Sequence, residues 1–146
     1  MNQNQRYQQP LIARLRDRGW RLTVQRRVVA EALSEPDLHL TADEVYSRAR
    51  ERVPEISKAT VYNTLGELTA MGELREVQLV PGPTRYDPNA TVVHHHLVCT
   101  QCGEISDIQP RGLEHLELSD DDRQGFELEQ IEVTFRGRCS SCAAKS

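Results

Sequence analysis

The feature that most constrains this chain is its use of cysteine: all four cysteines lie in two Cys-x-x-Cys pairs, Cys99 with Cys102 and Cys139 with Cys142. Each pair can chelate a metal ion from a tight turn, and together they supply the four thiolates of a tetrahedral zinc site. The gap of residues 103–138 exceeds the roughly 15–20 residues of a usual zinc ribbon, so the metal would tie the end of the chain to the start of its domain. We expect a structural zinc ion; a redox dithiol and unligated buried thiols are the alternatives.

Three consecutive histidines precede the first cysteine pair. Side chains alternate along a strand, so His94 and His96 share one side, and His95 is either a bystander or a ligand of a second site. A pair of imidazoles needs further ligands, and the residues alone do not decide among the candidates. These are Asp107, Asp87 and His39. Nitrogen and oxygen donors without a thiolate suit Fe(II), Mn(II), Ni(II) or Zn(II).

Charge is unevenly distributed along the chain. The net charge of −4 at first disfavours a nucleic-acid partner, but residues 1–30 carry seven arginines and one acidic residue, whereas residues 91–146 carry five basic and ten acidic residues. This asymmetry predicts two regions with different functions; a solvated arginine-rich helix face is the alternative. No apolar run approaches the ~18 residues of a membrane span, and the N-terminus lacks a signal-peptide core, so we expect a cytoplasmic protein without a membrane partner.

Local signals in the first half predict four short helices. Thr23 and Ser57 are candidate N-caps, and Thr41 with Glu44 forms a capping box. The expected helices span residues 10–18, 24–33, 42–52 and 58–72. In the second of them, the residues expected to face inward are Val24, Val28 and Val29. Two strands at 74–79 and 85–87, joined around a Pro-Gly-Pro turn, should follow as a hairpin.

Short helices joined by a tight turn resemble a helix-turn-helix, and an added hairpin suggests a winged helix. The outer face of the fourth helix carries polar and aromatic groups that suit DNA, and arginines near the start of the second helix favour phosphate. The residues expected to contact DNA are Arg21, Arg26, Ser57, Lys58, Thr60, Tyr62 and Asn63. The alternative is that this face is simply solvated.

The second half predicts short strands and a helix around the metal-binding turns. After a hinge at residues 88–91, strands are expected at 97–99 and 105–108, a helix at 112–118 and a strand at 126–136. In the last strand, Ile131, Val133 and Phe135 alternate with polar residues, the period of a half-buried strand. The fold class is therefore α+β.

Several motifs in order resemble the ferric uptake regulator family: HLTADEVY at 39–46, ISKATVYNTL at 56–65, RYD at 85–87, HHHLVCTQCGEISD at 94–107 and CSSC at 139–142. The resemblance implies a homodimeric metal-dependent repressor of double-stranded operator DNA. It implies a winged helix-turn-helix DNA-binding domain at 1–88 and a small α/β dimerisation and metal-binding domain at 89–146. It also implies structural zinc on the four cysteines, and that Tyr62 and Asn63 approach A/T-rich DNA.

Within that family, the chain is most similar to the peroxide-sensing repressors. They hold a regulatory Fe(II) or Mn(II) ion with three histidines and two aspartates, and this pattern falls on His39, Asp87, His94, His96 and Asp107. Iron-sensing members usually carry glutamate in place of Asp107. The extra cysteine of zinc sensors and the hairpin histidines of nickel sensors are missing here. Ile131 replaces a further histidine ligand of many members.

The resemblance implies that hydrogen peroxide oxidises His39 or His94 of the iron form and so releases the operator. An iron- or manganese-supply sensor without peroxide sensing is the alternative within the family. A metallohydrolase would need an open metal position and a placed general base. Glu104 is the nearest candidate base and has no paired acid, so we do not expect an enzyme. A zinc-stapled protein-interaction module without DNA binding is the third alternative.

Overall fold

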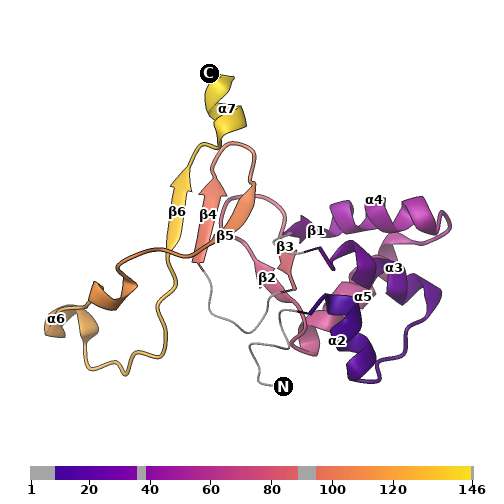
Figure 1. Ribbon diagram of the computed structural model, residues 1–146, viewed down its shortest axis with the longest axis horizontal. Helices are drawn as coiled ribbons and strands as arrows, with labels where there is room; N and C mark the ends of the chain where they lie inside the picture. The colour runs from indigo at the N-terminus through magenta and orange to yellow at the C-terminus, as the bar shows by residue number, and fades with distance from the viewer. Residues whose placement is uncertain (1–8, 36–38, 89–94, 146) are drawn as a thin grey trace. The chain divides into compact units, whose positions relative to one another are not determined.

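The computed structural model describes residues 9–35, 39–88 and 95–145. The chain forms two compact units, Met1–Val92 and Val93–Ser146, which are described separately below (Figure 1). The boundary expected after residue 88 stays a prediction, because residues 89–94 lie outside the described part. None of the described helices is long and apolar enough to cross a membrane.

Four helices build most of the first unit: α2 (Leu11–Asp17), α3 (Val24–Ala32), α4 (Ala42–Arg52) and α5 (Lys58–Ala70). All three expected caps are confirmed. The side chains of Thr23 and Ser57 accept hydrogen bonds from the backbone N–H groups of Arg26 and Thr60, and Thr41 and Glu44 form a reciprocal capping box. Each cap satisfies backbone donors that the helix itself leaves without a partner.

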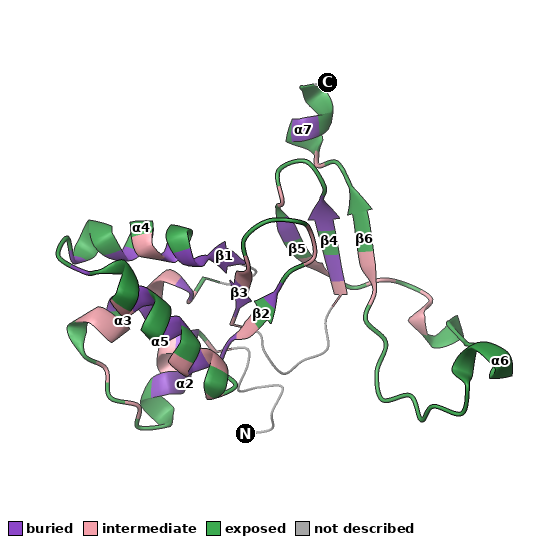
Figure 2. Ribbon diagram, turned by 180° about the vertical axis from the view of Figure 1, so that it is seen from behind, coloured by how far each residue is buried: buried purple, intermediate pink, exposed green. Residues whose placement is uncertain are grey.

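The helices enclose one apolar core. Leu15, Val29, Val45 and Leu65 are completely buried in it, and each comes from a different helix. Figure 2 shows buried and exposed segments alternating along these helices. The inward placement expected for Val24 is wrong, because its side chain is 69% exposed. Val24 is the first residue of α3, a full turn before the buried part of that helix.

A small antiparallel sheet completes the first unit, with strand order β1-β3-β2. The expected hairpin is confirmed as β2 (Arg75–Val77) and β3 (Arg85–Asp87). The first strand is shorter than expected, and the second has the expected bounds. The third strand, β1 (Leu40–Thr41), pairs with β3 and lies between the second and third expected helices, where no strand was expected. A strand of two residues shows no period, so no pattern of side chains marks it.

The second unit is a three-stranded sheet with strand order β5-β4-β6. Its strands are β4 (His95–Cys99), β5 (Ile105–Ile108) and β6 (Thr134–Gly137); β4 is antiparallel to β5 and parallel to β6. The first two strands agree with expectation. Two short helices, α6 (Asp120–Arg123) and α7 (Ser140–Ala144), were not expected.

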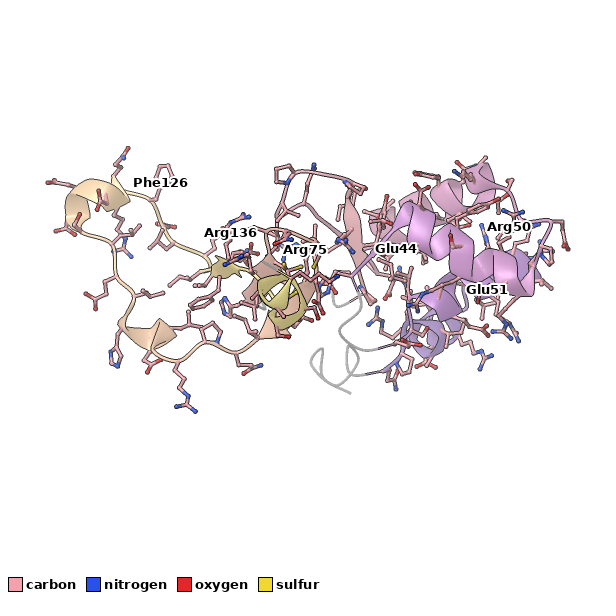
Figure 3. The ribbon with its side chains drawn as sticks, turned by 90° about the horizontal axis from the view of Figure 1, so that it is seen from above. Glu44, Arg50, Glu51, Arg75, Phe126 and Arg136 are labelled. Carbon is pink, nitrogen blue, oxygen red and sulfur yellow. The ribbon has the colours of Figure 1, made fainter. Side chains whose placement is uncertain are left out.

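Two expectations for the second unit are wrong in extent. The helix expected at 112–118 is only a 3-10 turn, Leu113–His115, because Gly112 is left-handed and Leu116 is extended. The strand expected at 126–136 is regular only from Thr134 onward. The alternation of apolar and polar residues indicates that one face should be covered, but a strand also needs a neighbouring strand to pair with. Residues 126–133 are not assigned to a strand. Phe126, labelled in Figure 3, is accordingly 72% exposed.

Candidate metal centres

The four cysteines come together at one end of the second sheet. Cys99 ends β4, Cys102 follows in a tight turn, and Cys139 and Cys142 lie at the start of α7. Their sulfur atoms all lie within 4.8 Å of one another, and the sulfurs of Cys102 and Cys139 are 3.9 Å apart. A tetrahedral zinc ion with ~2.3 Å bonds separates its sulfur ligands by ~3.8 Å. The donor set therefore fits zinc.

Backbone N–H groups point at these sulfurs. The sulfur of Cys99 accepts from the N–H groups of Cys102 at 3.5 Å and Cys139 at 3.3 Å, and the sulfur of Cys139 accepts from Cys142. These donors lower the pKa of Cys99 to about 6, whereas hydrogen bonding with Cys139 and burial raise the pKa of Cys142 to about 12. The cluster thus favours thiolate at Cys99, and a coordinated metal ion deprotonates a bound thiol outright.

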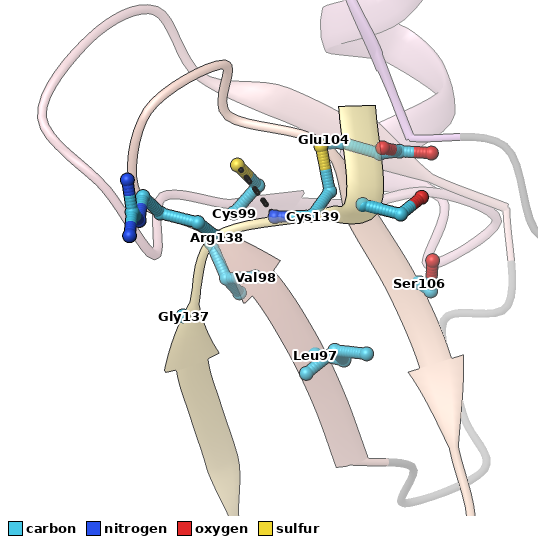
Figure 4. A pocket seen from close by; sticks show the side chains of 9 residues that line it. Leu97, Val98, Cys99, Glu104, Ser106, Gly137, Arg138 and Cys139 are labelled. Carbon is cyan, nitrogen blue, oxygen red and sulfur yellow. Dashed lines mark hydrogen bonds between the residues drawn. The ribbon is translucent and has the colours of Figure 1, made fainter. Parts of the chain in front are cut away.

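A cavity of about 300 Å³ lies beside the cysteines (Figure 4). Leu97, Cys99 and Cys139 line it together with the charged side chains of Glu104 and Arg138. Figure 4 also shows the N–H of Cys139 directed at the sulfur of Cys99. Two of the four cysteines therefore border this cavity.

The second unit also pairs an imidazole with a carboxylate. His96 of β4 lies directly opposite Asp107 of β5 in the antiparallel ladder, so both side chains lie on one face. Nε2 of His96 and Oδ1 of Asp107 are 3.4 Å apart. His95 has a structural role: its Nδ1 accepts a hydrogen bond from the N–H of Val133 at 3.0 Å. His94, the third expected histidine, lies outside the described residues.

The first unit holds a matching pair. His39 comes just before β1, Asp87 ends β3, and both are buried. Nε2 of His39 and Oδ2 of Asp87 are 3.2 Å apart. The two residues are far apart in sequence, and the pairing of β1 with β3 brings them together. Each unit, taken by itself, therefore holds one nitrogen and one oxygen donor of the kind that Fe(II) and Mn(II) accept.

The expected DNA-contacting residues occupy different environments. Lys58, Tyr62 and Asn63 are exposed on α5, and Tyr62 lines a cavity of about 270 Å³ with Thr84 of the hairpin and Asp43 of α4. This arrangement gives the helix and the hairpin a shared outer surface. The hydroxyls of Ser57 and Thr60 hydrogen-bond to each other within the helix cap. Their contacts to DNA remain a prediction.

Arg26 makes contacts that its sequence position does not indicate. Its guanidinium donates to both carboxylate oxygens of Glu67, at 2.9 and 3.0 Å, and lies 4.5 Å from the centre of the Trp20 ring. Another of its nitrogens donates to the carbonyl of Arg21, whose own side chain is exposed. These contacts hold α3 to α5, so Arg26 has a structural role whether or not it also meets phosphate.

Comparisons with known proteins agree on one family. The model of the ferric uptake regulator family matches residues 17–136. The chain is 36% identical over 135 residues to the ferric uptake regulation protein of Bacillus subtilis, covering 90% of this chain and 91% of that protein. It is 34% identical over 134 residues to the peroxide-responsive repressor PerR of Staphylococcus aureus, covering 92% and 90%.

Among solved structures, a zinc-bound manganese uptake regulator aligns with a TM-score of 0.71 at 26% identity, over 88% of this chain and 98% of that one. The names of these relatives describe regulators and a repressor of transcription or metal uptake. The chain belongs to the ferric uptake regulator family of metal-responsive transcriptional repressors and is not an enzyme.

Proposed function

We propose that this protein is a homodimeric repressor that holds a regulatory Fe(II) or Mn(II) ion and senses hydrogen peroxide through it. The observation that carries the proposal is an imidazole–aspartate pair in each unit: His39 with Asp87, and His96 with Asp107. Neither pair contains a thiol, and such donors suit these two metals. One pair is too small a ligand set, so we propose that both pairs, with His94, hold one ion.

We also propose that Cys99, Cys102, Cys139 and Cys142 hold a structural zinc ion. The support is the spacing of the sulfurs and the N–H groups that stabilise thiolate. All four positions of a tetrahedral ion would be filled by protein, so this site has no open position for chemistry. Its role is to fold the second unit.

An ion shared by both units explains how metal would control DNA binding. His39 and Asp87 belong to the first unit, and His96 and Asp107 to the second, so shared ligation fixes the angle between units. In a dimer that angle sets the spacing of two recognition helices, which must match two half-sites on DNA. Metal that binds the matching form better shifts the population towards DNA binding.

In this proposal α5 is the recognition helix. Tyr62 and Asn63 are exposed on its outer face and can reach base edges, while Lys58 and Arg21 carry exposed charges suited to phosphates. The dimer would form through the second unit. Leu97 and Phe135 are neighbours across β4 and β6, and each exposes about half of its side chain.

Peroxide would act on a ligand. Bound Fe(II), unlike bound Mn(II), would supply the redox chemistry that activates hydrogen peroxide. One oxygen atom of the peroxide would be inserted into a ring C–H bond of His39 or His94 and the other would leave as water, so that the ring loses two electrons to the peroxide and the iron is unchanged overall. The oxidised ring loses its basic nitrogen character, so the ligand is lost and the operator is released.

The test is intact mass and peptide mapping of the Fe(II)-loaded and Mn(II)-loaded protein after a brief exposure to hydrogen peroxide. We expect one added oxygen on His39 or His94 in the iron form only, together with loss of operator binding. His115, an exposed histidine next to Glu114, is the internal control and should stay unmodified. The variant His39→Ala should lose both metal-dependent DNA binding and peroxide release.

The alternative is a sensor of iron or manganese supply. The similarity to a ferric uptake regulation protein, at 36% identity, favours it as much as the similarity to PerR favours peroxide sensing. Metal-dependent DNA binding without histidine oxidation in either form would establish this alternative and overturn the peroxide proposal.

A further inference from the structure

Arg85 is the residue of the RYD motif that the proposed function leaves without a role. It lies on β3 two residues before Asp87, so both side chains are on the same face of the sheet. Across the ladder, Arg85 is opposite Thr41 of β1. The strand that presents Asp87 to the His39 imidazole therefore also presents a guanidinium to the same segment.

The guanidinium holds the main chain of His39. Nη1 of Arg85 donates to the carbonyl oxygen of His39 at 2.8 Å. The same nitrogen is 3.5 Å from Oε2 of Glu44, and that oxygen accepts the backbone N–H of Thr41 at 3.1 Å. The segment from His39 to Thr41 is thus attached to β3 by a charge-assisted network in addition to the strand pairing.

One strand, β3, therefore contacts His39 at two points. The His39 imidazole lies beside the Asp87 carboxylate, and the His39 carbonyl accepts a hydrogen bond from Arg85. Arg85 is only 18% exposed, so the contact is shielded from water more than a surface ion pair is. One guanidinium nitrogen, which carries two N–H groups, lies near both the His39 carbonyl and the Glu44 carboxylate.

We propose that Arg85 is a positioning residue of the regulatory site: it fixes the backbone of His39 so that the imidazole faces Asp87. This inference rests on the proposed role of His39 and Asp87 as metal ligands. Groups that orient a ligand without touching the metal change metal affinity by roughly 10- to 100-fold when they are removed. Loss of the Arg85 contact would free the His39 backbone and cost affinity for the metal.

The experiment uses the full-length, zinc-loaded protein and Mn(II) alone as the probe. Free Mn(II) is counted by its electron paramagnetic resonance signal during titration, and Co(II) absorption reports the ligand geometry. We expect Arg85→Gln to weaken Mn(II) binding by about tenfold and to alter the Co(II) ligand-field bands. Arg85→Lys, which keeps a cation and a donor, should lie between Arg85→Gln and the wild type, and it serves as the test if Arg85→Gln does not fold.

The matched control is Arg50→Gln. Arg50 lies on α4 in the same unit, is exposed, and has its guanidinium 5.9 Å from the Tyr46 ring (Figure 3). It should leave Mn(II) affinity and the Co(II) spectrum unchanged. His39→Ala tests the proposed regulatory site itself. Equal Mn(II) binding by the wild type and by His39→Ala would overturn that site.

If His39→Ala loses Mn(II) while both Arg85 variants bind like the wild type, the inference about Arg85 is overturned and the regulatory site stands. Weakened DNA binding with unchanged Mn(II) affinity would also overturn it, and would make Arg85 a DNA contact of the hairpin.

Discussion

The two units of this protein are stabilised by different means. The first has a continuous apolar core to which all four of its described helices contribute, including Leu15, Val29, Val45 and Leu65. In the second, Val98 and Ile105 are the buried aliphatic side chains of the described residues, and the remaining buried apolar residues are cysteines. Several large apolar side chains of this unit are instead exposed, among them Leu97, Phe126, Ile131 and Phe135.

This difference shows what each unit needs in order to fold. Units well below ~70 residues rarely obtain enough stability from one core, and natural ones add metal ions, disulfides or a partner chain. The second unit spans only residues 93–146. We propose that its four thiols and its exposed apolar side chains substitute for a larger core by binding a metal ion and a second copy of the chain. The first unit, with its continuous apolar core, should need neither.

The largest expected effect is that of zinc. Stripping the metal with a strong chelator, or substituting Cys102→Ser, should unfold the second unit, since structural zinc contributes on the order of 10 kcal/mol. Hydrogen exchange should then show lost protection over residues 95–142 with protection of α3 and α5 retained. Ser141→Ala, between two of the cysteines, is the matched control and should keep the zinc. Retained protection in the metal-free second unit would contradict this prediction, because it would mean that this unit folds without zinc.

The next effect concerns charge in the core of the first unit. Glu73 is 1% exposed and accepts from Nε of Arg14 at 3.1 Å and Nη1 of Arg18 at 2.8 Å. Arg14 is also buried and donates to the carbonyl oxygen of Pro88 at 2.6 Å. Removing one partner of such a pair leaves a buried charge uncompensated, which costs about 3–5 kcal/mol. Glu73→Gln should therefore destabilise this unit strongly.

Trp20, the single tryptophan, lies in the first unit and reports its unfolding in urea. The double variant Arg14→Met with Glu73→Leu should recover most of the lost free energy of unfolding, because it removes the two buried charges together. Arg18, the third member of the network, is partly exposed and keeps its hydrogen bond to the carbonyl of Met71. Glu35→Gln, which breaks an exposed pair with Arg48, is the control and should change stability by less than about 1 kcal/mol. Equal effects of Glu73→Gln and Glu35→Gln would contradict the buried role.

Exposed apolar residues of the two units should differ in their effect on dimerisation. Phe135→Ser removes an aromatic ring that we expect the partner copy to cover, and burial of such a side chain is worth about 1.5–3 kcal/mol. The dissociation constant of the dimer should rise at least about tenfold, measured by sedimentation. Val24→Ser, at an even more exposed apolar position of the first unit, should leave the dimer intact. Dimerisation unchanged by Phe135→Ser would place the interface elsewhere.

The sequence was most informative where the determinants are local. Three helix starts were predicted from capping residues within a four-residue window, and all three are confirmed: Thr23, Ser57 and the Thr41–Glu44 capping box. For the caps, the signal and its consequence lie within a few residues, so no knowledge of distant partners is needed. The convergence of the two Cys-x-x-Cys pairs is long-range, and it could be predicted because each pair needs the other to complete a four-thiolate site.

Distant partners account for what the sequence did not reveal. Arg14 and Glu73 are 59 positions apart, and Arg85 and His39 are 46 apart, so nothing local marks either contact. The pairing of His39 with Asp87 was expected only from the family resemblance. The strand expected at 126–136 is longer than the one observed, Thr134–Gly137. The alternation of its residues fits a face that a partner copy of the chain would cover, and a single chain does not provide that cover.

The smallest expected effect uses the same motif in both units. Thr41 caps α4, an eleven-residue helix packed on the core through Val45 and Ala49, so Thr41→Ala should cost about 1 kcal/mol in the free energy of unfolding. Ser119 makes an equivalent cap on α6, a four-residue helix with no buried residue, so Ser119→Ala should cost less than about 0.5 kcal/mol. Urea unfolding followed by Trp20 measures the first, and chelator resistance of the zinc-loaded protein measures the second. An N-cap contributes to the free energy of unfolding only when its helix packs on a core. Equal effects of the two substitutions would therefore mean that α6 is packed in solution, against a second copy of the chain.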